Sequence, residues 1–142
     1  MKIVDTNVLV YAISEDAQLH AVANAWLLET LSGSETVGFC WQVMIGFIRL
    51  MTHPSLSLSP LRHDHAITLV KSWLAQPPST VIVPTERHLN IVQELLDSVG
   101  IAGNLTNDAH IAALSIEHGA TVYSFDNDFS RFPRVRWAMP SL

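Results

Sequence analysis

Four aspartates stand where side chains gather in a protein that alternates strands and helices. Asp5 directly follows the first predicted strand, and Asp126 and Asp128 follow the last long one. Asp108 lies in the first turn of a predicted helix. A lone aspartate at such a boundary usually caps a helix or forms a turn. Several carboxylates at the edge of an apolar layer repel one another unless a cation neutralises them, and an all-oxygen cluster suits Mg²⁺ or Mn²⁺.

The elements that position these aspartates follow from the apolar spacing and from the helix-ending glycines and prolines. The spacing predicts strands over 2–4, 36–40, 80–83 and 120–124. Helices are predicted from Asp5 onward and over 20–32, 42–52, 60–75, 85–99 and 106–118, and a short helix and the segment 135–137 end the chain. This order favours an α/β sandwich, a central parallel sheet flanked by helices, with its site beyond the carboxyl ends of the strands.

Length and composition narrow the class of protein. The 142 residues suit a single domain, residues 1–142, and 49% hydrophobic against 15% charged residues excludes a disordered chain. Thirteen acidic and eight basic side chains give a net charge of −5, the opposite of the basic excess that often marks nucleic-acid binders. A polyanionic partner must therefore be held by a local patch or through metal ions.

The sequence also predicts where the chain works. Its one cysteine, Cys40, forms no intrachain disulfide, which favours a reducing cytoplasm. Asp5 and Asn7 interrupt the apolar run that an export signal would need. The longest uncharged apolar segment, 37–48, is too short to cross a membrane, so we expect no membrane association.

Four segments carry the polar residues at the predicted element ends. They are 1–9 (MKIVDTNVL), 46–54 (GFIRLMTHP), 106–114 (TNDAHIAAL) and 124–129 (SFDNDF). In this order they resemble the PIN-domain ribonucleases, and among them the VapC-type toxins of bacterial toxin–antitoxin pairs. The resemblance covers nearly the whole chain and implies a PIN-like α/β fold.

The resemblance implies that Asp5, Asp108 and Asp126 are catalytic and hold one or two Mg²⁺ ions, with Asp128 close by. Mn²⁺ is the alternative cation. An ion held by Asp5 and Asp108, with help from Asp126, would acidify a water molecule and polarise the scissile phosphate for in-line attack. No nucleophilic side chain is required, and the resemblance implies products with a 5′-phosphate.

Other positions are implied to lie near the ion or the substrate. Thr6 or Asn7 matches a small polar position that contacts the site, and Arg49 is implied to contact an RNA phosphate or an antitoxin carboxylate, unless it is only a helix-end cation. Many PIN domains carry a glutamate three residues before this arginine, where this chain has Gly46. Loss of that carboxylate makes a two-metal mechanism less secure than a one-metal mechanism.

The implied protein is the toxin of a toxin–antitoxin pair, a magnesium-dependent endoribonuclease that cleaves single-stranded or looped RNA. Its implied partners are the RNA and a cognate antitoxin protein that covers the site. The apolar helix predicted over 42–52, together with the resemblance, predicts a homodimer. No motif encodes which RNA is cleaved.

Two other functions remain open at this stage. A PIN-fold protein-interaction module without catalysis would explain Gly46, although Asp5, Asp108 and Asp126 are present. A phosphotransferase of the haloacid-dehalogenase type also places an aspartate after its first strand. It needs a second aspartate where Asn7 stands and a later lysine, and this chain has two lysines in all.

The histidines and tryptophans are predicted to be structural. The seven histidines show no metal-ligand spacing, and we expect surface or terminal positions for His53, His63, His65 and His88. The tryptophans expected to anchor the core or a dimer interface are Trp26, Trp41 and Trp73.

Overall fold

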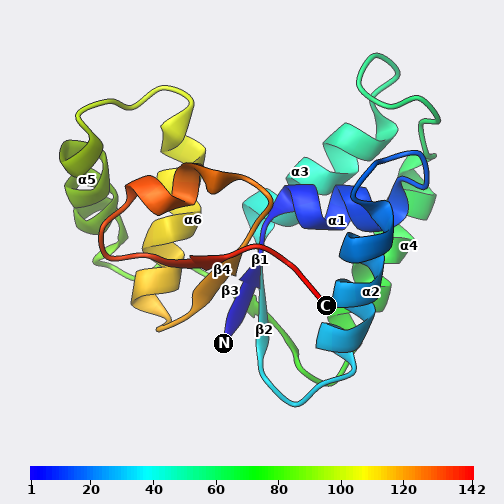
Figure 1. Cartoon of the computed structure of the whole chain (residues 1–142), viewed down its shortest axis with the longest axis horizontal. Helices are drawn as coiled ribbons and strands as arrows, with labels where there is room; N and C mark the ends of the chain where they lie inside the picture. Colours follow the sequence, from blue (N-terminus) through cyan, green and yellow to red (C-terminus); the bar gives the residue numbers. More distant parts are fainter.

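A computed structural model describes all 142 residues and contains a central five-stranded sheet in the order β3-β2-β1-β4-β5 (Figure 1). All neighbouring strands are parallel. The strands are β1 (Lys2–Val4), β2 (Val37–Cys40), β3 (Ser79–Ile82), β4 (Thr121–Tyr123) and β5 (Arg136–Ala138). The helices are α1 (Thr6–Ile13), α2 (His20–Leu31), α3 (Trp41–Thr52), α4 (His63–Leu74), α5 (His88–Val99) and α6 (Leu105–Glu117), with a 3₁₀ helix η1 (Asn127–Arg131). The predicted α/β sandwich is confirmed.

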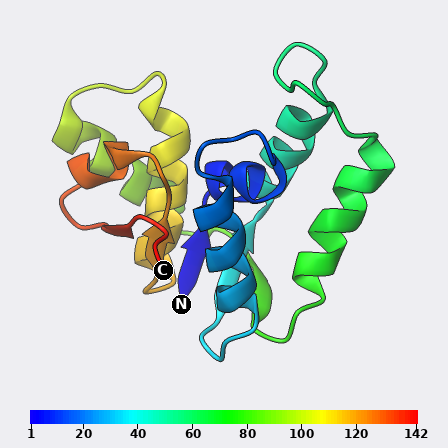
Figure 2. The ribbon, with the colours of Figure 1, turned by 45° about the vertical axis from the view of Figure 1, so that its right-hand side comes forward.

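Two groups of helices flank the sheet (Figures 1 and 2). Helix α1 packs against α2 and α3, and α4 packs against α3. On the other side α5 and α6 pack against each other, with η1 against α6. The sheet lies between the two groups (Figures 1 and 2).

The central strand β1 is buried between its neighbours β2 and β4. Ile3 and Val4 are fully buried, as is Val122 on the neighbouring strand β4. A strand covered on both faces reads as a continuous apolar run, which is the pattern of β1. The register pairs Val4 with Tyr123, so the next residues along both strands, Asp5 and Ser124, emerge at the same edge of the sheet.

Two helix starts differ from the sequence prediction. The helix predicted from residue 60 begins at His63, because the backbone N–H of Leu61 donates to the Met51 carbonyl at 2.8 Å and ties that segment to the end of α3. The helix predicted from Thr85 begins at His88, since the Thr85 hydroxyl accepts from the backbone N–H of Arg87 at 3.2 Å in a turn before the helix. A local cap pattern does not reveal such competing contacts.

The prediction that the tryptophans anchor the core or a dimer interface is confirmed for Trp26 and Trp73, and for Trp41 the dimer interface stays a prediction. Trp26 packs against Tyr123 at 4.8 Å between ring centroids, and Trp73 meets Phe47 edge-on at 4.9 Å. Trp41, at the start of α3, is 57% exposed and therefore does not anchor the core. None of the helices is long and apolar enough to span a bilayer.

Candidate active site

The end of β1 turns directly into α1 through Asp5, which is the N-cap of that helix. One carboxylate oxygen of Asp5 accepts the backbone N–H of Thr6 at 2.7 Å. The other oxygen accepts the Ser124 hydroxyl at 2.6 Å and the Asn7 side-chain amide at 3.4 Å. The Asp5 side chain is thus buried and fixed by three donors at the carboxyl edge of the sheet.

Ser124, which was not among the residues predicted for the site, links the polar groups at this edge of the sheet. Its hydroxyl is fully buried, donates to Asp5, and accepts from the Asn7 amide and the backbone N–H of Asp126, each at 3.0 Å. The Asn7 side-chain oxygen in turn accepts the backbone N–H of Phe125 at 3.1 Å. These bonds lock the end of β4 to the start of α1. The signal that could have identified Ser124 is its place directly after β4, beside Asp5 across the sheet.

Three aspartates converge next to this edge. Asp108 on α6 and the pair Asp126 and Asp128 each offer one carboxylate oxygen within 4.8 Å of the others. Asp126 also caps η1 by accepting the backbone N–H of Asp128 at 2.9 Å. The structure therefore joins the predicted residues Asp108 and Asp126 with Asp128, which was expected only to lie close by. Asp5 is outside this group, although it lines the same cleft as Asp108.

The positive charges near this group of carboxylates are too few to balance its negative charge. Burial raises the pKa of Asp108, and the negative charges of Asp126, Asp5 and Asp128 raise it as well, together to about 7. Burial also raises the pKa of Asp5, against the lowering effect of its bond from Ser124. The nearest cation is Arg131, whose guanidinium is 4.0 Å from Asp128. An all-oxygen donor set of this kind fits a Mg²⁺ or Mn²⁺ ion, which would remove the repulsion.

A cleft of about 440 Å³ opens beside Asp5 and Asp108, between α3 and α6. Its wall on α3 includes Gly46 and Arg49, and Thr6 lies at its base. Arg49 makes no ion pair within 4.0 Å, so its charge is available to a ligand. A Cβ atom at Gly46 would lie 3.3 Å from the Thr6 hydroxyl, which is tight packing. Of the residues predicted to lie near the ion or the substrate, Thr6 and Arg49 line this cleft, Asn7 bonds to Asp5, and Asp128 belongs to the acidic group.

The model of the PIN domain family matches residues 2–135, and the chain belongs to that family. Ribonuclease VapC37 of Mycobacterium tuberculosis is 46% identical over 140 residues, covering 99% of this chain and 97% of that protein. Ribonuclease VapC33 of the same organism is 37% identical over 99% of this chain and 98% of its own length. The chain is therefore of the VapC type, and the haloacid-dehalogenase alternative is not favoured.

Solved structures agree on the fold. VapC20 of Mycobacterium tuberculosis, a sarcin–ricin loop cleaving toxin, superposes with a TM-score of 0.70 at 19% identity, covering 96% of this chain and 99% of that one. The VapBC2 complex from Rickettsia felis, bound to a DNA fragment from its promoter, gives a TM-score of 0.67 at 24% identity and 97% coverage of both chains. At these identities the likeness shows the PIN-type arrangement of sheet and helices.

Proposed function

We propose that this chain is the toxin of a toxin–antitoxin pair and a divalent-metal-dependent endoribonuclease. The observation that carries the proposal is the convergence of Asp108, Asp126 and Asp128 beside Asp5, at the carboxyl edge of the sheet, in a chain 46% identical to a VapC ribonuclease. A catalytically inactive interaction module would have no need for a group of carboxylates in which burial and neighbouring negative charges raise the pKa of Asp108 to about 7.

The aspartates would hold the cation, with Mg²⁺ the expected ion and Mn²⁺ the alternative. When bound, such an ion supplies an acidified water and a Lewis acid for the phosphate. Asp108 and Asp126 would ligate it directly, and Asp128 would complete the carboxylate group. Asp5 would act from the buried edge, where its bonds to Thr6 and Ser124 fix its orientation.

The RNA would lie in the cleft between α3 and α6. Arg49 is the cation of that cleft without a carboxylate partner, and it would contact a phosphate next to the scissile bond. The side-chain amides of Gln42 and Asn107 also line the cleft and make no hydrogen bond within the protein. These groups suit a single-stranded or looped RNA whose bases splay out, and cleavage would leave a 5′-phosphate.

Two protein partners belong to the proposal. A cognate antitoxin would cover the acidic cleft, as the VapBC complex named above is an assembly of toxin and antitoxin. A second copy of this chain would cover the apolar side chain of Trp41 at the start of α3, which is 57% exposed and lies outside the residues that line the cleft. The chain would work in the cytoplasm as a single domain of residues 1–142.

Cleavage of total cellular RNA by purified, antitoxin-free protein tests the function. We expect discrete fragments with Mg²⁺, none with EDTA, and none from an Asp108→Asn variant of equal thermal stability. Mapping of the fragment ends would identify the RNA. Cleavage that persists in EDTA, or no cleavage by the folded wild-type protein, would contradict the proposal, and the second outcome would favour a module that only binds its partner.

A further inference from the structure

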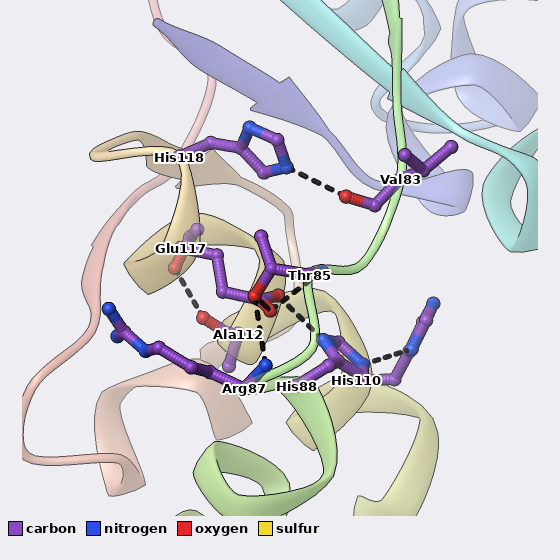
Figure 3. Close-up of polar contacts among 9 residues, drawn as sticks. Val83, Thr85, Arg87, His88, His110, Ala112, Glu117 and His118 are labelled. Carbon is purple, nitrogen blue, oxygen red and sulfur yellow. Dashed lines mark hydrogen bonds and ion pairs between the residues drawn. The ribbon is translucent and has the colours of Figure 1, made fainter.

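A second group of ionisable side chains is drawn in Figure 3 and includes His110, which stands two residues after Asp108 and so points to a different side of α6. Its centre is Glu117 at the end of α6, whose side chain is fully buried. The carboxylate accepts the backbone N–H of Thr85 at 2.9 Å and also the Thr85 hydroxyl. It pairs with Nδ1 of His88 at 2.6 Å. The mechanism proposed above uses none of these groups.

The chain of contacts continues along α6. Nε2 of His88 lies 2.8 Å from Nδ1 of His110, so one ring donates and the other accepts. The two rings meet edge-on at 4.8 Å between centroids. His88, which the sequence placed at the surface or at a helix end, is the first residue of α5, yet its side chain is only 14% exposed. Beside this chain the ring of His118 binds the Val83 carbonyl at 2.9 Å.

These contacts fasten α6 to α5 and to the connection that follows β3 (Figure 3). Glu117 and His110 are the only side chains of α6 that hydrogen-bond to another element. The N-cap residue Asn104 gives no side-chain bond at the other end of the helix. Polar restraint of α6 by side chains therefore comes from this network alone.

His110 connects the network to the acidic cluster through the helix. It stands two residues after Asp108, and residues two apart on a helix point to different sides. The Asp108 side chain forms no hydrogen bond that would fix it from its own side of α6. The position of this carboxylate relative to Asp126 and Asp128 thus depends on how α6 is placed, by its buried apolar face and by the polar network on its opposite side.

The carboxylate at the centre of the network is satisfied by its partners. Burial alone would raise the pKa of Glu117, but the bonds from Thr85 and His88 outweigh it and hold the pKa below its ordinary value. The carboxylate is therefore ionised and fully partnered. Removing a partner of a buried charged group costs more than removing an exposed ion pair, because the buried charge is left without a hydrogen bond.

We propose that His110, His88 and Glu117 are positioning residues, which set the place of the Asp108 carboxylate in the acidic cluster by holding α6 from its opposite side. The inference rests on the proposed function, because it takes Asp108 as a ligand of the divalent cation. Partners that orient metal ligands from outside commonly change metal affinity by about 10–100-fold.

A pair of variants at one position tests this. In His110→Phe the ring shape is kept and the bond to His88 is lost, whereas the amide of His110→Asn places a polar atom close to where Nδ1 stands. We expect His110→Phe to weaken Mn²⁺ binding, measured by calorimetry, by about tenfold. We expect His110→Asn to restore most of it. In RNA cleavage the Mg²⁺ midpoint should rise by the same factor, with the KM for RNA unchanged at saturating Mg²⁺.

Controls separate positioning from general stability. His65→Phe, an exposed histidine on α4, should leave Mn²⁺ affinity unchanged. If His110→Phe does not fold, Thr85→Val removes one bond to Glu117 at nearly constant shape and should weaken Mn²⁺ binding by about two- to threefold. Folded His110→Phe with wild-type Mn²⁺ affinity, or equal loss in His110→Asn, would overturn the inference alone. Wild-type protein that binds no Mn²⁺ would overturn the cation site of the proposed function, and the inference with it.

Discussion

Asp108 and Glu117 lie on the same helix and show two opposite ways of placing a carboxylate. Glu117 is buried with three donors around it, and its pKa is held below the ordinary value. Asp108 has no donor, and burial together with three neighbouring carboxylates raises its pKa to about 7. A group that the fold has satisfied stabilises the fold, whereas a group left with like charges needs a ligand that the chain does not supply. Helix α6 therefore has one side, with Glu117, that is anchored to neighbouring elements, and another side, with Asp108, that is proposed to bind a cation.

The largest effect is expected from Asp108→Asn. The change keeps the shape of the side chain but removes one negative charge from the acidic cluster, so the cation would lose a ligand. The negative charge that develops on the phosphate in the transition state would then be less stabilised. We expect RNA cleavage to fall by about 100-fold or more, measured as the initial rate at saturating Mg²⁺. Asp5→Asn should also abolish cleavage with the fold intact, and a wild-type rate in either variant would remove that residue from the mechanism.

Glu117→Gln disrupts the network that fastens α6 to α5 and to Thr85. The amide cannot accept from all three donors, so buried polar groups lose their partner at a cost of about 1–3 kcal/mol in the free energy of unfolding. Because the pKa of Glu117 is lowered in the fold, its contribution is present above the ordinary value of 4.5 and is lost as the pH falls through the lowered value. Urea unfolding at neutral pH measures the effect. An unchanged midpoint would show that the network does not stabilise α6.

The contribution of Asp108 to the free energy of unfolding should depend on pH with the opposite sign to that of Glu117. Asp108 has an ordinary pKa of 3.8 and a folded value of about 7, so the unfolded chain loses this proton first as the pH rises. The metal-free protein should therefore lose stability between about pH 4 and pH 7. Thermal unfolding across this range should show the decline in wild-type protein and a smaller one in Asp108→Asn. Added Mg²⁺ should reduce it too, and an equal decline in all three samples would contradict the assignment.

Arg49→Ala should give the smallest effect. Arg49 lines the cleft without a carboxylate partner, and a phosphate contact at an exposed site contributes modestly. We expect the KM for RNA to rise about threefold to tenfold with little change in kcat, and the dependence of binding on salt to weaken. Arg62→Ala is the matched control, because Arg62, just before α4, does not line the cleft and is already paired with Asp64. A fall in kcat without a change in KM would assign Arg49 to the chemical step instead.

The location of the site followed from the sequence because strand ends are local features. An apolar run that stops at Asp5 and another that stops before Asp126 already predict a shared edge in a parallel sheet. The positions of the helices across that edge are not local. Whether Asp5 or Asp128 joins Asp108 and Asp126 depends on how α6 packs, and no periodicity reports that.

The roles of Ser124 and His88 could not be predicted from the sequence, for the same reason. Ser124 gains its role from Asp5 and Asn7, which are far from it in the sequence. His88 looks like an ordinary helix-start histidine until α6 brings Glu117 and His110 against it. Contacts between distant segments decide these roles, whereas capping residues and apolar spacing report only neighbours along the chain.

The central claim is that the acidic cluster beside α6 binds a divalent cation. The most direct test is calorimetric titration of Mn²⁺ into the metal-free wild-type protein and into Asp108→Asn at pH 7. We expect one binding event in the wild-type protein, accompanied by release of a fraction of a proton because Asp108 must ionise, and much weaker binding in the variant. Equal binding by the two proteins, or no binding by the wild type, would contradict the metal site.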